Sequence, residues 1–388
     1  MPPDSPSSVR APRQAAPLAF PAGTPPLTAL YIYVSGSCNL PCRHCWITPQ
    51  FSPNGLNGTF VKLEHVEKAI REAKTVGLSQ VKLTGGEPTL HPRFRELVSL
   101  VAGLGVPFWM ETNGTLIDRS LAEFLRDTGK AGTISVSLDG AKAETHEALR
   151  MVPGSFDRAV AGIKALVDAS FRPQVICSLH QGNVSEAAEV VRLAEKLGCG
   201  SVKFNIIQEM GRGERFSREE GLSVPRALEF LRHLEKDVVP YTGISIHPDF
   251  PMAFWSIRRL LREPNAHCAV LHILGVLATG ELSICGVGSS LPELVYGHLD
   301  VDDLGEVWRS SPGLQRLRRQ IPHELEGVCG ECLHRDICLG SCVASNYSLG
   351  GKLSVAFGFC DVASGLGLFP ESRRTPASLR AEGGDGGQ

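Results

Sequence analysis

Three cysteines near the start of the chain, Cys38, Cys42 and Cys45, have the spacing C-x3-C-x2-C. Three thiolates this close together can hold an iron–sulfur cube by three of its four irons. The fourth iron then lacks a protein ligand, and catalytic metal sites keep such an open position whereas structural sites close it. The residues alone leave two alternatives, a zinc site completed by a ligand such as His44, or disulfide bonds.

A second group of cysteines lies in the last third of the chain. Cys268, Gly280 and Cys285 form the pattern C-x11-G-x4-C. Four of the remaining five, Cys329, Cys332, Cys338 and Cys342, follow the pattern C-x2-C-x5-C-x3-C, and Cys360 ends the group. Closely spaced cysteines in a cytosolic protein indicate metal binding more than disulfides, although the four-cysteine run alone is also compatible with zinc. Cys177 and Cys199 stand apart, and we expect them to be small buried hydrophobic residues.

The composition is that of an ordinary globular protein. A chain of 388 residues with 43% hydrophobic residues can bury a large core, as two domains or as one with an appendage. A net charge of −2 gives no indication of nucleic acid as a partner. The sequence contains no apolar run of about 18 residues, so we expect no membrane span. Prolines interrupt the N-terminal segment where a signal peptide would lie. We therefore expect a cytoplasmic protein.

Strand-like and helix-like segments alternate between Leu27 and Ile207. Six such units predict an α/β fold with a parallel sheet and right-handed crossovers, in the form of a partial (β/α)6 TIM-like barrel. The expected strands are 30–34, 81–83, 108–110, 133–138, 175–179 and 202–206. We expect a disordered segment over 1–26, a barrel over 27–215, bridging helices over 216–265, a cysteine-rich domain over 266–362 and a disordered tail over 363–388.

Polar motifs follow the expected strands, at the barrel end that carries functional groups in such folds. Thr84-Gly-Gly-Glu-Pro88 follows the second strand, and its glycines allow close approach of the backbone to a ligand. Glu111-Thr-Asn-Gly-Thr115 follows the third and Ser137-Leu-Asp-Gly140 the fourth, with Arg150 farther on. The first two motifs also have a plain alternative, a turn, and the alternative for Arg150 is a surface position on a helix.

Together, the cysteine spacing and these motifs resemble the radical S-adenosylmethionine (radical SAM) enzymes. The C-terminal cysteines resemble the SPASM extension of the subgroup that modifies peptides and proteins. The resemblance covers residues 27–362 and implies a SAM-binding [4Fe–4S] cluster on Cys38, Cys42 and Cys45. It further implies SAM contacts, which we assign to Gly85, Gly86, Glu87, Pro88, Asn113, Ser137, Asp139 and Arg150. Thr112 is a second candidate, and His44 matches the position of an aromatic ring near adenine.

For the C-terminal part the resemblance implies two auxiliary [4Fe–4S] clusters. Cys268, Cys285 and Cys342 would hold the first, which then lacks a fourth cysteine. That iron is open to substrate or capped by another group, and His267 and His272 are close in sequence. The second cluster would be held by Cys329, Cys332, Cys338 and Cys360. Two further segments have no assigned role, Ser178 to Asn183 and Glu209 to Gly213, which contains Arg212.

The resemblance implies hydrogen abstraction from a ribosomally made peptide or a protein, followed by a C–S or C–C crosslink or an oxidation. No side chain is assigned as the catalytic group. Flavodoxin or ferredoxin is expected as electron donor, and a separate protein as a possible carrier of a leader peptide. Alternatives are a sulfatase-type maturase, which typically has aspartate where this chain has Gly286, and an enzyme of tetrapyrrole or quinone cofactor biosynthesis. A non-catalytic iron–sulfur or zinc protein is the remaining class.

Overall fold

The computed structural model describes residues 23–54, 57–262 and 268–376. Within them, ten strands form one sheet in the order β12-β11-β10-β1-β4-β5-β6-β7-β8-β9. Pairing is parallel from β10 through β1 to β9 and antiparallel at β11 and β12. The strands are β1 (Ala29–Ser35), β4 (Gln80–Gly85), β5 (Phe108–Thr112), β6 (Ala131–Ser137), β7 (Gln174–Leu179), β8 (Ser201–Ile206), β9 (Ser245–Asp249), β10 (Ile273–Val276), β11 (Glu281–Ser283) and β12 (Val295–His298).

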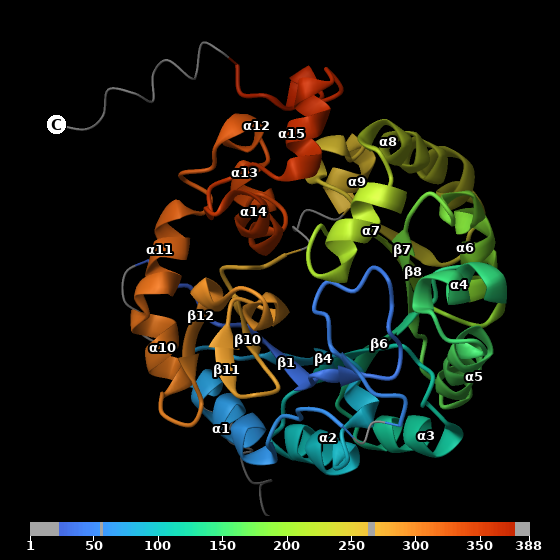
Figure 1. The fold of residues 1–388 in the computed structure, drawn as a ribbon, viewed down its shortest axis with the longest axis vertical. Coiled ribbons are helices and arrows are strands. Elements are labelled where there is room, and N and C mark those ends of the chain that lie inside the picture. The colour runs from blue at the N-terminus through green and yellow to red at the C-terminus, as the bar shows by residue number, and fades with distance from the viewer. Residues whose placement is uncertain (1–22, 55–56, 263–267, 377–388) are drawn as a thin grey trace, which may run out of the picture.

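Helices cover the outside of the curved sheet (Figure 1). The apolar residues that recur at helical spacing on the first two helices, such as Val66 and Leu97, are buried. Asp118 begins a third helix by accepting a hydrogen bond from the amide of Leu121. The helices of this layer are α1 (Leu63–Lys74), α2 (Phe94–Gly103), α3 (Arg119–Asp127), α4 (Ala143–Arg150), α5 (Ser155–Asp168) and α6 (Ala187–Lys196).

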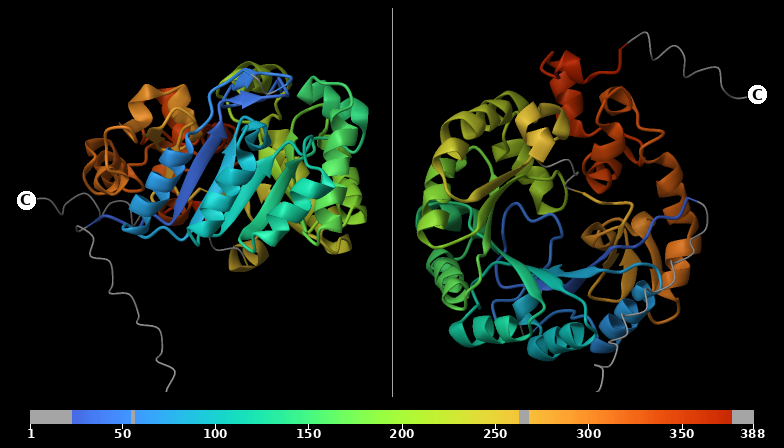
Figure 2. Two further views of the ribbon diagram at one scale, coloured as in Figure 1. Left: turned by 90° about the horizontal axis from the view of Figure 1, so that it is seen from below. Right: turned by 180° about the vertical axis from the view of Figure 1, so that it is seen from behind.

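The predicted partial barrel is confirmed, because the six expected strands are β1, β4, β5, β6, β7 and β8, in parallel order. The loop after β1 stands over the edge of the sheet where these strands end (Figure 2). It includes a two-stranded ladder of β2 (Ser37–Cys38) and β3 (Gln50–Phe51). The cysteine motif is therefore carried at the end of the barrel where the other motifs also lie.

The segment 216–265 differs from the expected bridge of helices. It contains α8 (Val224–His233), as predicted, but also β9, a seventh parallel strand beside β8. Pro248 disfavours a strand in the sequence, yet β9 lies at the edge of the sheet, where proline is tolerated. After β9 the segment continues as a short turn, η5 (Met252–Phe254), followed by α9 (Ile257–Arg262).

The C-terminal part continues the barrel sheet through β10, which pairs with β1. Its helices lie beyond β12 at one side of the barrel (Figure 1). They are α10 (Leu304–Ser310), α11 (Pro312–Gln320), α12 (Gly327–Gly330), α13 (Arg335–Cys338), α14 (Val343–Gly350) and α15 (Gly358–Gly365), while α7 (Arg212–Glu220) belongs to the barrel rim. Shorter helical turns are η1 (Pro88–Leu90), η2 (Val184–Glu186), η3 (Leu234–Val238), η4 (Val239–Tyr241), η6 (Gly286–Ser289), η7 (Pro292–Leu294) and η8 (Glu371–Arg373).

The prediction of a disordered tail from residue 363 is wrong for 363–376. Phe369 is only 4% exposed, and Arg374 forms an ion pair with Glu331 (2.8 Å). The prediction followed from the glycine-rich end of the sequence and did not account for the apolar segment that precedes it. At the other end, the carbonyl of Pro25 accepts a hydrogen bond from Trp308, so Pro25 is also in contact with the fold. The rest of both segments, 1–22 and 377–388, lies outside the described residues.

No helix in the described ranges is long and apolar enough to cross a membrane.

Candidate active site

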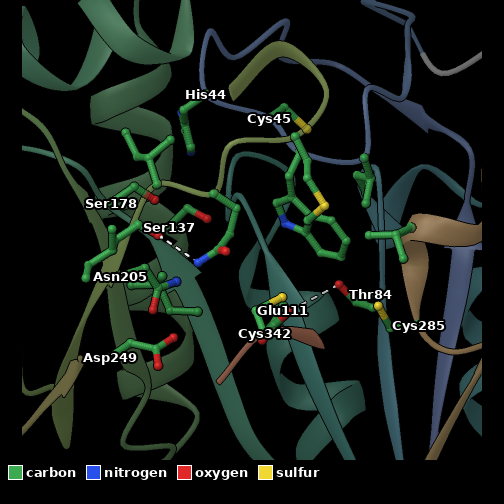
Figure 3. Close-up of a pocket in the computed structure, with 18 of the residues that line it drawn as sticks. His44, Cys45, Thr84, Glu111, Ser137, Ser178, Asn205, Asp249, Cys285 and Cys342 are labelled. Atoms are coloured by element: carbon green, nitrogen blue, oxygen red, sulfur yellow. Dashed lines mark hydrogen bonds between the residues drawn. The ribbon is translucent and has the colours of Figure 1, made fainter. Parts of the chain in front are cut away.

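A cavity of about 380 Å³ opens inside the barrel, and both cysteine groups reach it. Cys38, Cys42 and Cys45 line one end. The other end carries cysteines that lie more than 200 residues later, Cys268, Cys285, Cys338 and Cys342. Figure 3 shows His44 and Cys45 at the top of this space and Cys285 and Cys342 toward the bottom. The fold therefore brings together two cysteine groups that the sequence only suggests separately.

The thiols of this cavity are not paired with one another. All twelve cysteines lie in described parts of the chain and carry free thiols, so the structure does not contain the disulfides considered as an alternative. Among the described residues, no three His, Cys, Asp or Glu side chains converge as they would on a single metal ion. A cluster of several atoms holds its ligands farther apart than one ion does.

Gly85 and Gly86 line the cavity, where glycine was expected to let a ligand approach the backbone. They also pack on the start of the cysteine loop. A β-carbon at Gly86 would stand 2.0 Å from the carbonyl oxygen of Ser37. One at Gly85, where φ is +131°, would stand 2.6 Å from that of Ser35. The amides of Gly86 and Glu87 donate to the carbonyls of Ser35 and Ser37, respectively (2.7 and 2.8 Å). The glycines therefore fix the loop that carries the cysteines.

Glu87 is fully buried (0% exposed), and its carboxylate accepts hydrogen bonds from other residues of the protein. Oε1 accepts hydrogen bonds from the hydroxyls of Thr89 (2.5 Å) and Thr112 (2.7 Å), and Oε2 accepts one from the amide of Asn113 (2.8 Å). Burial raises the pKa of Glu87, and these hydrogen bonds oppose that rise. Pro88, also buried, begins the turn η1. In this structure Glu87 thus positions the end of β5, and its predicted contact with SAM stays a prediction.

Asn113 reaches the cysteine loop directly. Its Nδ2 donates to Oδ1 of Asn39 (2.8 Å) and to Sγ of Cys38 (3.9 Å). Its Oδ1 accepts from the amide and the hydroxyl of Thr115 (2.9 and 2.7 Å). The Asn-Gly pair is therefore a turn, as the plain alternative held, and its asparagine also contacts a predicted cluster ligand.

Ser137 lines the cavity, whereas Asp139 is fully buried (0% exposed) behind it. Oδ1 of Asp139 accepts from the amide of Ser178 (2.8 Å), and Oδ2 accepts from Nε of Arg150. Burial raises the pKa of Asp139, but the guanidinium of Arg150 outweighs it and lowers this pKa to about 2. The guanidinium thus keeps Asp139 ionised, and the predicted contact of Asp139 with SAM stays a prediction.

Arg150 is buried at the end of α4, so the surface position considered for it is wrong. Its Nη1 donates to Sγ of Cys42 (3.6 Å) while Nε is bound to Asp139. Burial lowers the pKa of Arg150, and the carboxylate of Asp139 reverses this and raises it. The predicted contact with the SAM carboxylate stays a prediction; in this structure the guanidinium lies on a cysteine thiol.

The two unassigned segments support this end of the cavity. Asn183 donates from Nδ2 to the carbonyl of Asp139 (2.8 Å), and Ser178 lines the cavity. Arg212 donates from Nε to the carbonyl of Cys42 (2.8 Å). A β-carbon at Gly211 would stand 2.6 Å from the carbonyl oxygen of Trp46. The 209–213 segment is therefore a clamp on the cysteine loop.

Cys338, which lines the cavity, belongs with three further cysteines that do not line it. Cys329, Cys332, Cys338 and Cys360 come from α12, the residues after it, α13 and α15. Backbone amides donate to two of the thiols, from Phe357 to Cys329 and from His334 to Cys332 (both 3.4 Å). Burial raises the pKa of Cys285 to about 12, and the neighbouring Cys342 adds to this. Cys177 and Cys199 are both 1% exposed within the core, as expected of small hydrophobic residues.

Comparison with known proteins agrees with this geometry. The family described as the radical SAM superfamily matches residues 32–197, which include the cysteine loop and the strands from β4 to β7. This chain contains a radical SAM domain. Proteins of this family use a [4Fe–4S] cluster and SAM, so both are cofactors here.

Relatives of this radical SAM enzyme cover most of its length. An AdoMet-dependent heme synthase of Methanosarcina barkeri is 27% identical and aligns over 82% of this chain and 91% of its own. Mycofactocin maturase MftC of Mycobacterium tuberculosis is also 27% identical, over 81% of this chain and 78% of its own. The structure of Streptococcus suis SuiB bound to S-adenosylmethionine has a TM-score of 0.69 at 17% identity, covering 87% of this chain and 77% of SuiB. The fold is thus the radical SAM barrel with a C-terminal cysteine-rich SPASM domain.

The cavity of the radical SAM enzyme fits a polar ligand beside the cysteine loop. Two buried polar atoms in its wall, Nδ1 of His44 and Oδ1 of Asn205, have no partner within the protein. Such atoms normally require a hydrogen bond. Burial, and to a smaller extent the positive charge of Arg150, lowers the pKa of His44 to about 3. The ring of His44 is therefore neutral. A nucleoside with ring nitrogens and hydroxyls can satisfy both atoms.

Charged side chains deep in the cavity were missed from the sequence. Lys82 pairs with Glu111 (2.7 Å) and Lys203 with Asp249 (3.4 Å) across the inner face of the sheet, and Thr84 donates to Glu111 (3.2 Å; Figure 3). Their signal was the polar alternation within apolar strands, as in Lys82-x-Thr84 and Lys203-x-Asn205.

Of the two histidines considered as caps for the first auxiliary cluster, His272 does not line the cavity. Its ring lies 3.0 Å from the carbonyl oxygen of Pro26, and His267 lies outside the described residues. The ring of Tyr33 instead lies beside Cys285, and a β-carbon at Gly286 would stand 2.2 Å from it.

Proposed function

We propose that this radical SAM enzyme abstracts a hydrogen atom from a ribosomally made peptide or a protein and completes a crosslink or an oxidation. One observation carries the proposal: a single cavity joins Cys38, Cys42 and Cys45 to Cys268, Cys285 and Cys342. A substrate held there lies between a radical source and a second redox centre. A maturase among the relatives, and a structure of SuiB bound to precursor peptide SuiA, support a peptide as substrate.

We assign the cluster ligands as the sequence indicates. Cys38, Cys42 and Cys45 hold the SAM cluster, and with SAM bound this cluster supplies the 5′-deoxyadenosyl radical. Cys268, Cys285 and Cys342 hold the first auxiliary cluster, and Cys329, Cys332, Cys338 and Cys360 hold the second. The backbone amides that donate to Cys329 and Cys332 are typical of iron–sulfur sites, where hydrogen bonds to sulfur tune the reduction potential.

The charges in the cavity favour an uncharged polar substrate. Lys82 and Lys203 are each paired with a carboxylate, Glu111 and Asp249, so these four side chains sum to zero. Peptide amides can hydrogen-bond with such paired groups, whereas a substrate with several carboxylates needs an excess of cations. The wall is also supplied with aromatic and apolar groups such as Tyr31 and Ile273.

Tetrapyrrole chemistry is the second candidate, because the heme synthase from Methanosarcina barkeri matches over 82% of this chain. A sulfatase-type reaction has less support, since the ring of Tyr33 fills the space where a side chain at position 286 would lie. We further propose flavodoxin or ferredoxin as electron donor, a separate leader-peptide-binding protein, and the cytoplasm as location, where thiols stay reduced.

The deciding experiment reconstitutes the enzyme anaerobically and offers it two kinds of substrate. One is a short cysteine-containing peptide encoded beside the gene, and the other is an iron porphyrin carrying propionates. We expect SAM-dependent loss of hydrogen atoms from the peptide by mass spectrometry, and none from the Cys38/Cys42/Cys45→Ala variant. Formation of heme from the porphyrin, with the peptide unchanged, would overturn the proposal in favour of the second candidate.

A further inference from the structure

Two side-chain hydrogen-bond donors point at the sulfur atoms of the cysteine loop. Nη1 of Arg150 lies 3.6 Å from Sγ of Cys42, and Nδ2 of Asn113 lies 3.9 Å from Sγ of Cys38. The backbone amide of Leu40 also donates to Cys38 (3.4 Å). Of these, only Arg150 carries a charge, and a guanidinium stays protonated in proteins.

Arg150 is held in this position from behind. Its Nε is bound to Oδ2 of Asp139, whose other oxygen accepts from the amide of Ser178 (2.8 Å). The backbone of Asp139 is fixed as well, by its amide donating to Nδ1 of His146 (3.1 Å) and by its carbonyl accepting from Asn183 (2.8 Å). Asp139 is fully buried, so water does not compete for its carboxylate. The guanidinium therefore has a fixed anchor on one edge and a thiol on the other.

The opposite donor has the same construction. Glu87, also fully buried, accepts from the amide of Asn113 and orders the turn that presents its side chain. Each of the two side-chain donors to a cysteine sulfur is thus anchored by a buried carboxylate that follows a strand end. An anchored donor loses little conformational entropy when it forms its hydrogen bond to the sulfur atom. Groups that contact metal ligands also tune the properties of the metal.

We propose that Arg150 is a positioning residue that raises the reduction potential of the SAM cluster by donating to the Cys42 thiolate, with Asp139 as its anchor. A positive donor at a ligand sulfur stabilises the additional negative charge of the reduced cluster. This inference rests on the proposed assignment of the cluster to Cys38, Cys42 and Cys45. It gives Arg150 a role before SAM binds, distinct from a contact with the SAM carboxylate.

The test is a redox titration of the reconstituted full-length enzyme, followed by electron paramagnetic resonance without and with SAM. The signal of the SAM cluster is identified as the one missing from the Cys38/Cys42/Cys45→Ala variant. For Arg150→Gln without SAM, we expect the ratio of reduced to oxidised cluster to fall about tenfold at a fixed potential near the midpoint. For one electron that is a shift of about 59 mV to a more negative potential. Arg150→Lys keeps the charge but not the planar fork. Its reduction potential should lie between those of the wild type and of Arg150→Gln.

Arg212 provides the matched control, because it bonds to the carbonyl of Cys42 and not to its sulfur. Arg212→Gln should leave the potential of any cluster it retains unchanged. An unchanged potential in Arg150→Gln, with weaker SAM binding alone, would overturn the inference and make Arg150 a SAM ligand.

Loss of iron needs its own control, since removing Arg150 leaves Asp139 buried without its cation. The double variant Asp139→Asn/Arg150→Gln restores neutrality and should retain the cluster at the lowered potential. If no Arg150 variant retains it while circular dichroism shows the wild-type fold, Arg150 serves cluster assembly and the inference fails. If instead the triple cysteine variant keeps all its iron, the cluster assignment itself fails, whatever Arg150 does.

Discussion

Gly86 lies so close to Ser37 that a β-carbon at position 86 would stand 2.0 Å from the carbonyl oxygen of Ser37. The turn after β4 and the start of the cysteine loop are thus packed backbone against backbone. Ligand approach was the expected reason for glycine here, but the chain itself already excludes a side chain.

Replacing Gly86 with alanine should therefore disturb the cysteine loop. Because the nearest atoms belong to backbone, the strain cannot be relieved by a rotamer change, and we expect a loss of about 1–3 kcal/mol in unfolding free energy together with lower iron content. Denaturant unfolding and iron analysis measure both. A β-carbon at Gly103 in α2 would meet no neighbouring atom within 4 Å, so Gly103→Ala is the control and should be neutral or slightly stabilising. Equal effects of the two changes would contradict the packing explanation.

Replacing Lys82 with methionine should change how stability depends on pH. Burial raises the pKa of Glu111, but Lys82 outweighs it and lowers this pKa, so in the wild type Glu111 contributes stability above its unfolded pKa of about 4.3. Without Lys82, burial dominates and the folded pKa rises above that value. The variant should then gain stability on going from pH 7 to pH 5, whereas this group gives the wild type no such gain.

Unfolding curves of the cluster-free protein at pH 7 and pH 5 measure this difference. The double variant Lys82→Met/Glu111→Gln is the control, since it has no carboxylate at position 111 and should lose the added pH dependence. Persistence of that dependence in the double variant would assign it to another group.

Ending the chain after Gly365 should weaken the second auxiliary site. Residues 366–376 cover it, because Arg374 pairs with Glu331 and its backbone forms a bridge with Cys332. We expect the truncated enzyme to hold about four fewer irons, or to lose its absorbance faster in air. A chain that ends after Pro376 keeps these contacts and is the control. Identical iron content and bleaching rates in both would show that the segment does not protect the site.

Replacing Cys342 with alanine should separate radical formation from later chemistry. Cys342 lies in the cavity wall but away from the SAM motif, so we expect about four fewer irons with SAM cleavage to 5′-deoxyadenosine retained. Product formation from the peptide should fall. Cys177, buried in the core, is the control, and Cys177→Ala should leave iron content unchanged. Unchanged crosslinking after replacement of each of Cys268, Cys285 and Cys342 would rule out a role for the first auxiliary set.

The sequence alone determined the features that depend on local spacing. C-x3-C-x2-C places Cys38, Cys42 and Cys45 on one loop, and helical and strand periods predict the parallel barrel because they reflect burial of one face. Gly-Gly-Glu-Pro and Asn-Gly could be placed at strand ends for the same reason. Cys177 could be recognised as a core residue because it lies within an apolar strand.

Only the tertiary structure decided which of these groups meet. The sequence did not reveal that Glu87 is buried and bonded to the amide of Asn113, or that Asp139 is buried and bonded to Arg150. Pairing of β10 with β1 brings Cys285 to the cavity, although more than 200 residues separate it from the first motif. Hydrogen bonding between strands and the direction of inward-facing side chains are set by contacts across the whole sheet. Local sequence patterns carry no information on such contacts, which is why Lys82, Glu111 and the cover over the second cysteine group emerged only from the fold.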